Sequence, residues 1–194
     1  VYVNVDGGPG DMKNTSPAEV EEIMRYAGEN PDKSIAVITP FVNQRILIER
    51  GIKENGFEHV VCGTVHAFQG DEKDVVLFST ALSDRTGNGT YDWLKNNKEL
   101  INVATSRAKD KLILLADGKE LERLHQGNED DDLYELVQYV KMNGESKITE
   151  KHISSRALGI QPFSTETEAA FMKNLTHALE NIWLTRNKYT IHKE

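Results

Sequence analysis

The apolar residues of this chain follow two patterns that alternate along its length. Short apolar runs predict strands, at residues 1–5, 34–39, 59–62, 74–82 and 111–116. Longer stretches with apolar positions three and four residues apart predict helices, at about residues 17–28, 40–54, 97–108, 119–125 and 131–142. Strands that alternate with helices in this way are typical of an α/β fold with a doubly wound, mainly parallel sheet.

The boundaries of several elements carry their own signals. Ser16 and Pro17 begin the first helix, with Ser16 as the N-cap and Glu19 completing a capping box. Pro40 is expected in the first turn of the second helix. Residues 83–92 (SDRTGNGTYD) are polar and rich in glycine, which predicts a loop.

The same pattern predicts the domain organisation. Residues 1–143 form one domain, which starts directly on a strand and is therefore expected to lie inside a larger protein. Residues 144–163 are expected to be a linker, and residues 164–194 a helical extension with apolar residues on one stripe. Two interpretations of the extension stay open: the truncated start of a nuclease-like domain, or a helix that packs back on the first domain.

Composition narrows the classes of protein. The formal net charge of −8 argues against a free-standing nucleic-acid-binding protein, although a domain that lines one wall of a channel can be acidic overall. Cys62 is the single cysteine, which excludes internal disulfides and a cysteine-built zinc site and favours a reducing cytoplasm. No apolar run approaches the ~20 residues that span a membrane.

Three segments carry the chemistry: residues 37–44 (VITPFVNQ), 63–79 (GTVHAFQGDEKDVVLFS) and 102–109 (NVATSRAK). In this order and spacing they resemble motifs IV, V and VI of superfamily 1 helicases, in the branch of the nonsense-decay helicase. The resemblance covers roughly residues 1–121. It implies the second, C-terminal RecA-like motor domain of an ATP-dependent DNA or RNA helicase.

The resemblance also implies roles for individual residues. Gln44, Gly70 and Glu72 would bind ATP, with Gly70 at the γ-phosphate and Glu72 at the ribose. Thr64 and His66, just upstream, would contact the backbone of single-stranded DNA or RNA.

Arg107 would be an arginine finger that reaches the triphosphate. A helical wheel places it on the apolar stripe with Leu100, and a guanidinium on the packed side of a helix needs a partner or a cleft. Arginine suits a bidentate grip on phosphate oxygens. The alternative is a structural ion pair between Arg107 and a nearby carboxylate.

A phosphate-binding loop of the G-x-x-x-x-G-K-[ST] type is not found in the sequence. The acidic box at residues 71–74 precedes its strand instead of ending it, which argues against a magnesium site there. ATP and Mg²⁺ are therefore expected on the N-terminal RecA-like domain of the same protein, with no metal held by this chain and no turnover by the isolated chain. The competing hypothesis is a catalytically silent RecA-like scaffold that binds other proteins.

Overall fold

The structure is a computed structural model that describes residues 1–6, 12–64, 68 and 72–149. Within these ranges the strands are β1 (Tyr2–Asn4), β2 (Ile35–Ile38), β3 (Val60–Gly63), β4 (Lys73–Ser79), β5 (Ala108–Ala116) and β6 (Ser146–Ile148). The helices are α1 (Pro17–Glu29), α2 (Val42–Asn55), α3 (Asn88–Lys95), α4 (Lys98–Ser106), α5 (Gly118–His125) and α6 (Asp132–Asn143). The predicted alternation of strands and helices is therefore confirmed.

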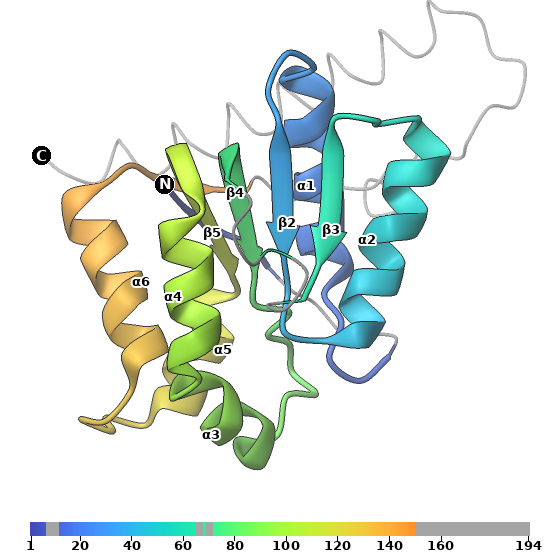
Figure 1. Ribbon diagram of the computed structural model, residues 1–194. Helices are drawn as coiled ribbons and strands as arrows, with labels where there is room; N and C mark the ends of the chain where they lie inside the picture. Colours follow the sequence, from blue (N-terminus) through green and yellow to red (C-terminus); the bar gives the residue numbers. More distant parts are fainter. Residues whose placement is uncertain (7–11, 65–67, 69–71, 150–194) are drawn as a thin grey trace, which may run out of the picture. The chain divides into compact units, whose positions relative to one another are not determined.

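The strands form one sheet in the order β3-β2-β4-β5-β1-β6, and every neighbouring pair is parallel. Parallel strands place all their amino ends at one edge of the sheet and all their carboxyl ends at the other. We refer to these as the amino edge and the carboxyl edge. In Figure 1, β2 and β3 run from the amino edge at the top to the carboxyl edge below.

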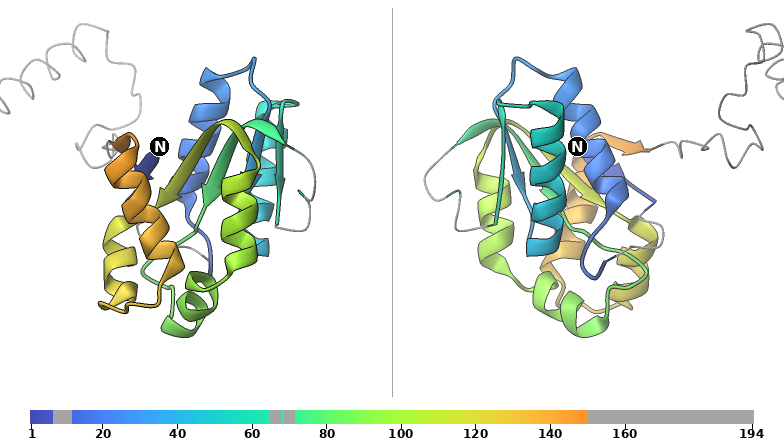
Figure 2. Two further views of the ribbon diagram at one scale, coloured as in Figure 1. Left: turned by 60° about the vertical axis from the view of Figure 1, so that its left-hand side comes forward. Right: turned by 90° about the vertical axis from the view of Figure 1, so that its right-hand side faces the viewer.

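Both faces of the sheet are covered, as a doubly wound fold requires. Alternate residues of β2 show this: Ile35 and Val37 pack with α1 and α2, whereas Ala36 and Ile38 pack in the core cluster that includes α4 and α6. Figure 2 shows α1 and α4 on opposite sides of the strands. β2 is buried on both faces along its whole length and β4 over its last five residues, so both strands are apolar runs in the sequence.

Two elements were not predicted from the sequence. α3 occupies part of the predicted loop at 83–92, because Tyr91 and Leu94 are buried although the surrounding residues are polar. β6 lies inside the predicted linker at 144–163 and pairs with β1 through its backbone, while its side chains stay exposed. A strand held by backbone pairing alone leaves no apolar pattern to detect.

The ends of three helices differ from the prediction. α2 begins at Val42, so Pro40 precedes the helix instead of lying in its first turn. α4 ends at Ser106, and Ala108 already belongs to β5. At α1, the Ser16 hydroxyl accepts the Glu19 N–H as predicted, but the Glu19 carboxylate bonds elsewhere.

The first compact unit of the chain is Val1–Glu150, and the second, Lys151–Glu194, lies outside the described residues together with the predicted extension. None of the helices in the described ranges has the length and apolarity needed to cross a bilayer.

Candidate functional site

Two of the residues predicted to bind ATP lie side by side at the amino edge. Glu72 directly precedes β4 and Arg107 directly precedes β5, and these two strands are neighbours in the sheet. The Lys73 N–H donates to the Arg107 carbonyl oxygen at 3.1 Å, and Lys73 pairs with Ala108 in the register of the strands. The sheet therefore fixes the backbones of Glu72 and Arg107 next to each other.

The side chain of Arg107 is half-buried where α4 turns into β5. Its Nε atom is buried without a hydrogen-bond partner, and among the described residues no carboxylate forms an ion pair with it. Leaving a buried charged donor unpaired costs more than an ordinary hydrogen bond contributes. Within the described residues, the structural ion pair weighed as an alternative is therefore not formed.

The position of Arg107 follows from the packing of α4. Leu100, Val103 and Ala104 are buried against the sheet, and the Asn97 side chain caps the helix by accepting the Leu100 N–H at 3.1 Å. The predicted apolar stripe is confirmed for these residues. Arg107 does not continue it as a helical position, because it is the C-cap, and the chain enters β5 one residue later.

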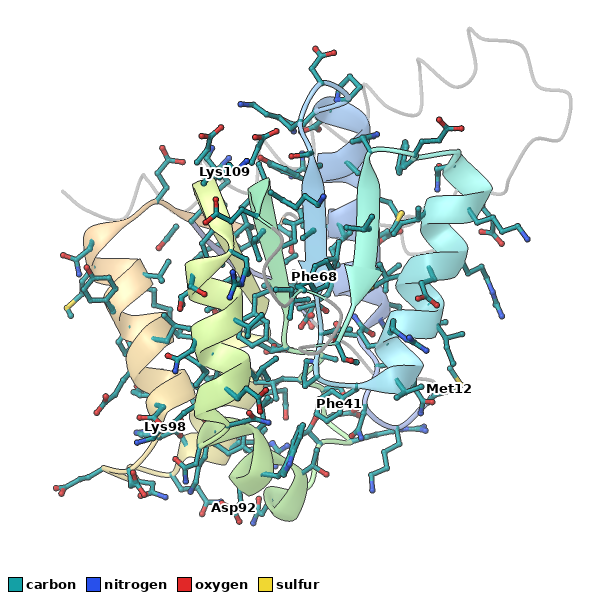
Figure 3. The ribbon with its side chains drawn as sticks, in the orientation of Figure 1. Met12, Phe41, Phe68, Asp92, Lys98 and Lys109 are labelled. Atoms are coloured by element: carbon teal, nitrogen blue, oxygen red, sulfur yellow. The ribbon has the colours of Figure 1, made fainter. Side chains whose placement is uncertain are left out.

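Basic side chains surround this part of the amino edge. Lys109 and Lys111 follow Arg107 on β5 and are exposed. Figure 3 shows Lys109 at the amino edge, at the opposite end of the sheet from Phe41. The intervening Asp110 is paired with Lys33, at 3.0 Å between Nζ and Oδ2. With Glu72 and Asp74 at the start of β4, the charges at this part of the amino edge are mixed.

The acidic box at 71–74 contributes a structural residue. Asp74 accepts hydrogen bonds from the Ser34 N–H at 2.9 Å and from the Ser34 hydroxyl at 2.8 Å. These hydrogen bonds lower the pKa of Asp74, and the one from the backbone N–H has the larger effect. Asp74 thus ties the start of β4 to the start of β2. In the described ranges, no group of three or more His, Cys, Asp or Glu residues is arranged to hold a metal ion.

Gln44, the third described residue with a predicted ATP contact, lies at the opposite edge. It is fully buried, and its amide bonds to Ser16 and to the hydroxyl of Ser79, the last residue of β4. β4 separates this position from Glu72 by about 23 Å, since seven strand residues rise about 3.3 Å each. The structure therefore brings Glu72 and Arg107 together and does not bring Gln44 to them.

Thr64, predicted to contact a nucleic-acid backbone, also lies at the carboxyl edge, directly after β3. The neighbouring Gly63 carbonyl accepts the Thr39 N–H at 3.2 Å. The Thr39 hydroxyl is buried and has no hydrogen-bond partner among the described residues. His66 and Gly70, the two remaining predicted site residues, lie outside the described residues.

Glu19 is a buried carboxylate that sequence reasoning did not place in the site. It accepts the Ser79 hydroxyl at 2.5 Å and the Ala81 N–H at 3.0 Å, and its other neighbour is the Thr80 hydroxyl at 3.2 Å. Burial raises the pKa of Glu19 to about 8, against the lowering effect of these hydrogen bonds. Ala81 has a φ of +54°, a strained value for alanine that the Glu19 carboxylate helps to hold.

The parallel sheet with helices on both of its faces is the architecture of a RecA-like α/β domain. The comparison with protein families agrees. The chain belongs to the AAA domain family, whose model matches residues 15–119. Within that family it is the second RecA-like domain of a superfamily 1 helicase.

The matched relatives are much longer than this chain. The chain is 32% identical over 124 residues to the regulator of nonsense transcripts 1 homolog of Drosophila melanogaster. This alignment covers 59% of this chain and 10% of the Drosophila protein. The chain is 32% identical over 105 residues to the DNA replication ATP-dependent helicase/nuclease JHS1 of Arabidopsis thaliana, covering 54% and 8%. The chain thus spans about a tenth of the length of the relatives it matches.

A solved structure was also matched. It is the C-terminal domain of a possible DNA helicase from Lactobacillus plantarum WCFS1, with a TM-score of 0.43 and 15% sequence identity. The match covers 77% of this chain and 83% of that one.

Proposed function

We propose that this domain supplies an arginine finger to ATP that is held by the first RecA-like domain of the same helicase. The observation that carries the proposal is the buried Nε of Arg107, which has no hydrogen-bond partner among the described residues and lies beside Glu72 at the amino edge. A triphosphate presented by a facing domain would give that guanidinium the anion it lacks. A finger of this kind contributes roughly 10³–10⁵ in rate by neutralising charge in the transition state.

Glu72 would hold the ribose of the same nucleotide, since it is exposed and its backbone adjoins that of Arg107. Gly70 would approach the γ-phosphate, as its motif implies. Mg²⁺ supplies charge neutralisation between the phosphates when ATP is bound, and the proposal assigns its ligands to the first domain. The residues of this chain then act by binding and orienting the nucleotide.

The nucleic-acid track would lie at the carboxyl edge, where Thr64 directly follows β3 and His66 comes two residues later in sequence. Contacts to the phosphate backbone carry no base information, so binding should be insensitive to sequence and sensitive to salt. One of the relatives is named for DNA replication and another for nonsense transcripts. The proposal therefore specifies a single-stranded nucleic acid and does not choose between DNA and RNA.

Thr64 and Glu72 lie at opposite edges of the sheet but close together in sequence. Thr64 directly follows β3, and Glu72 directly precedes β4. A nucleotide contact at Glu72 and a strand contact at Thr64 are thus separated by eight positions in sequence, since 72 − 64 = 8. This arrangement would couple the state of the nucleotide to the grip on the strand.

The test is the ATPase activity of the intact helicase with Arg107→Ala and Arg107→Lys. We expect kcat to fall at least about 10³-fold in the alanine variant. The lysine variant should recover only part of the loss, because an ammonium cannot form the bidentate contact. Arg50→Ala, an exposed arginine on α2, is the matched control and should leave kcat unchanged. Near-normal turnover by Arg107→Ala, with the fold intact by circular dichroism, would refute the finger.

A further inference from the structure

An exposed tryptophan stands at the carboxyl edge. Trp93 lies on α3 between the buried residues Tyr91 and Leu94, and 52% of it is accessible to solvent. Its ring lies 6.0 Å from that of Phe41, between centroids, at an interplanar angle of 45°. Phe41 is itself only 8% exposed and belongs to the core. The indole of Trp93 therefore packs against Phe41 and is still half exposed to solvent.

The position of Phe41 places this aromatic pair beside the proposed track. Phe41 is the N-cap of α2 and lies two residues after Thr39, which is hydrogen-bonded to Gly63 at the end of β3. Figure 3 shows Phe41 and Asp92, the neighbour of Trp93, at the end of the domain opposite Lys109. Trp93, Phe41 and Thr64 therefore share the carboxyl edge.

The charges around the aromatic pair permit a polyanion. Asp92 is the nearest carboxylate in sequence, and its Oδ1 is 3.0 Å from the Lys95 Nζ, so its charge is offset locally. Arg45 follows one turn after Phe41 and donates its backbone N–H to the Phe41 carbonyl at 3.0 Å.

The Arg45 side chain lies at the same edge. It forms a long ion pair with Glu49, at 3.8 Å between Nε and Oε1, and among the described residues its Nε has no hydrogen bond. Burial raises the pKa of Cys62 to about 12, and the charges of Glu49 and Arg45 also act on that thiol, which places Arg45 near the end of β3.

We propose that Trp93, supported by Phe41, is a stacking platform for a base of the single strand whose phosphates lie on Thr64 and Arg45. The inference rests on the proposed function, because it needs a strand at the carboxyl edge. Stacking on an aromatic face suits a motor, since every base has a π-face and the contact tolerates any sequence. The indole is suited to this role because its neighbours Tyr91 and Leu94 fix its helix in the core.

The experiment uses the chain with Trp183→Phe, which leaves Trp93 as its single tryptophan. Oligo(dT) and oligo(U) are titrated while the fluorescence of Trp93 and the anisotropy of a labelled strand are followed. We expect the strand to quench Trp93. Trp93→Ala should weaken binding by roughly 5- to 150-fold, and Trp93→Tyr should restore most of the affinity.

Salt dependence separates stacking from charge. Trp93→Ala removes no cation, so the slope of log affinity against log salt should stay unchanged. Arg45→Ala should reduce that slope by about one. Tyr139→Ala, which removes a similarly exposed aromatic from α6, is the matched control and should alter neither affinity nor slope.

Two results would overturn the platform and leave the helicase function standing. One is an unchanged affinity of Trp93→Ala for both strands while Arg45→Ala binds more weakly. The other is protection of Trp93 from acrylamide without any strand, which would mean that a protein surface covers it. Failure of the unsubstituted chain to bind either strand would overturn the platform and the proposed track together, and the Arg107 test would then stand alone.

Discussion

Gln44 and Ser16 are joined by two hydrogen bonds that run in opposite directions. The Ser16 N–H donates to Gln44 Oε1 at 2.8 Å, and Gln44 Nε2 donates to the Ser16 carbonyl at 3.2 Å. A side-chain amide from α2 thus takes the place that the Glu19 carboxylate would have in a capping box of α1. Gln44 Nε2 also donates to the Ser79 hydroxyl at 3.0 Å. The Gln44 side chain therefore connects α2, on which it lies, to the start of α1 and to the end of β4.

Gln44→Leu should therefore lower the stability of the domain. The change leaves buried groups of Ser16 without partners, at about 1–3 kcal/mol for each group. Urea unfolding of the domain measures the loss, and Asn43→Leu, an exposed neighbour, is the control. In the intact helicase, a rise of the KM for ATP without any loss of stability would instead support the nucleotide contact expected from the sequence.

The buried Glu19 should make stability depend on pH. Its pKa is about 8 in the folded chain and about 4.5 as a reference for the unfolded chain. Because the folded value is the higher one, its contribution is complete below pH 4.5 and is lost as the pH rises towards 8. The slope in this window is up to about 1.4 kcal/mol per pH unit.

The measurement is the free energy of unfolding between pH 5 and pH 9 for the unsubstituted chain and for Glu19→Gln. We expect a flatter profile for the variant, whatever its absolute stability, because glutamine does not ionise. Profiles of equal slope would show that Glu19 ionises as freely in the folded chain as in the unfolded one.

Thr39 and Thr80 form a matched pair for the energetics of buried hydroxyls. Both are fully buried, but the Thr39 hydroxyl is unpartnered, whereas the Thr80 hydroxyl is 3.0 Å from the Leu115 carbonyl. Thr39→Val should stabilise the domain by about 1 kcal/mol, and Thr80→Val should destabilise it by a similar amount. Shifts of the same sign in thermal unfolding would contradict this assignment.

Glu72→Ala should weaken ATP binding in the intact helicase without greatly slowing the chemical step. A ribose contact is made equally in the ground state and the transition state, so its loss raises KM several-fold and leaves kcat nearly unchanged. Steady-state ATPase kinetics test this, with Glu58→Ala, an exposed glutamate just before β3, as the control. A fall in kcat at constant KM would give Glu72 a role in the chemistry.

The sheet was predictable because its strands are buried on both faces, and burial leaves apolar runs such as 34–39 in the sequence. α3 was not, since its two buried side chains are surrounded by glycine and polar residues. β6 was not either, because backbone pairing at a sheet edge imposes no side-chain pattern. Local patterns report burial, and they do not report hydrogen bonds between distant backbones.

Arg107 was predictable as an unusual residue, since a guanidinium beside Leu100 conflicts with the apolar pattern. The proximity of Arg107 and Glu72 could not be predicted from their spacing in the sequence. The register of β4 and β5 places these two residues next to each other. The separation of Gln44 from this pair has the same origin. Motif order along the chain cannot distinguish the two ends of a parallel strand, and only the folded sheet does.

The length of β4 has a mechanical consequence. Its last five residues, Val75–Ser79, are buried, and hydrogen bonds tie it to β2 and β5 over most of its length. A strand that is paired on both sides and buried does not stretch or bend easily. A displacement at one end of β4 should therefore move the whole sheet as a rigid body. Under the proposed function, β4 would transmit a displacement at the nucleotide contact of Glu72 to the opposite edge of the sheet as a rigid element.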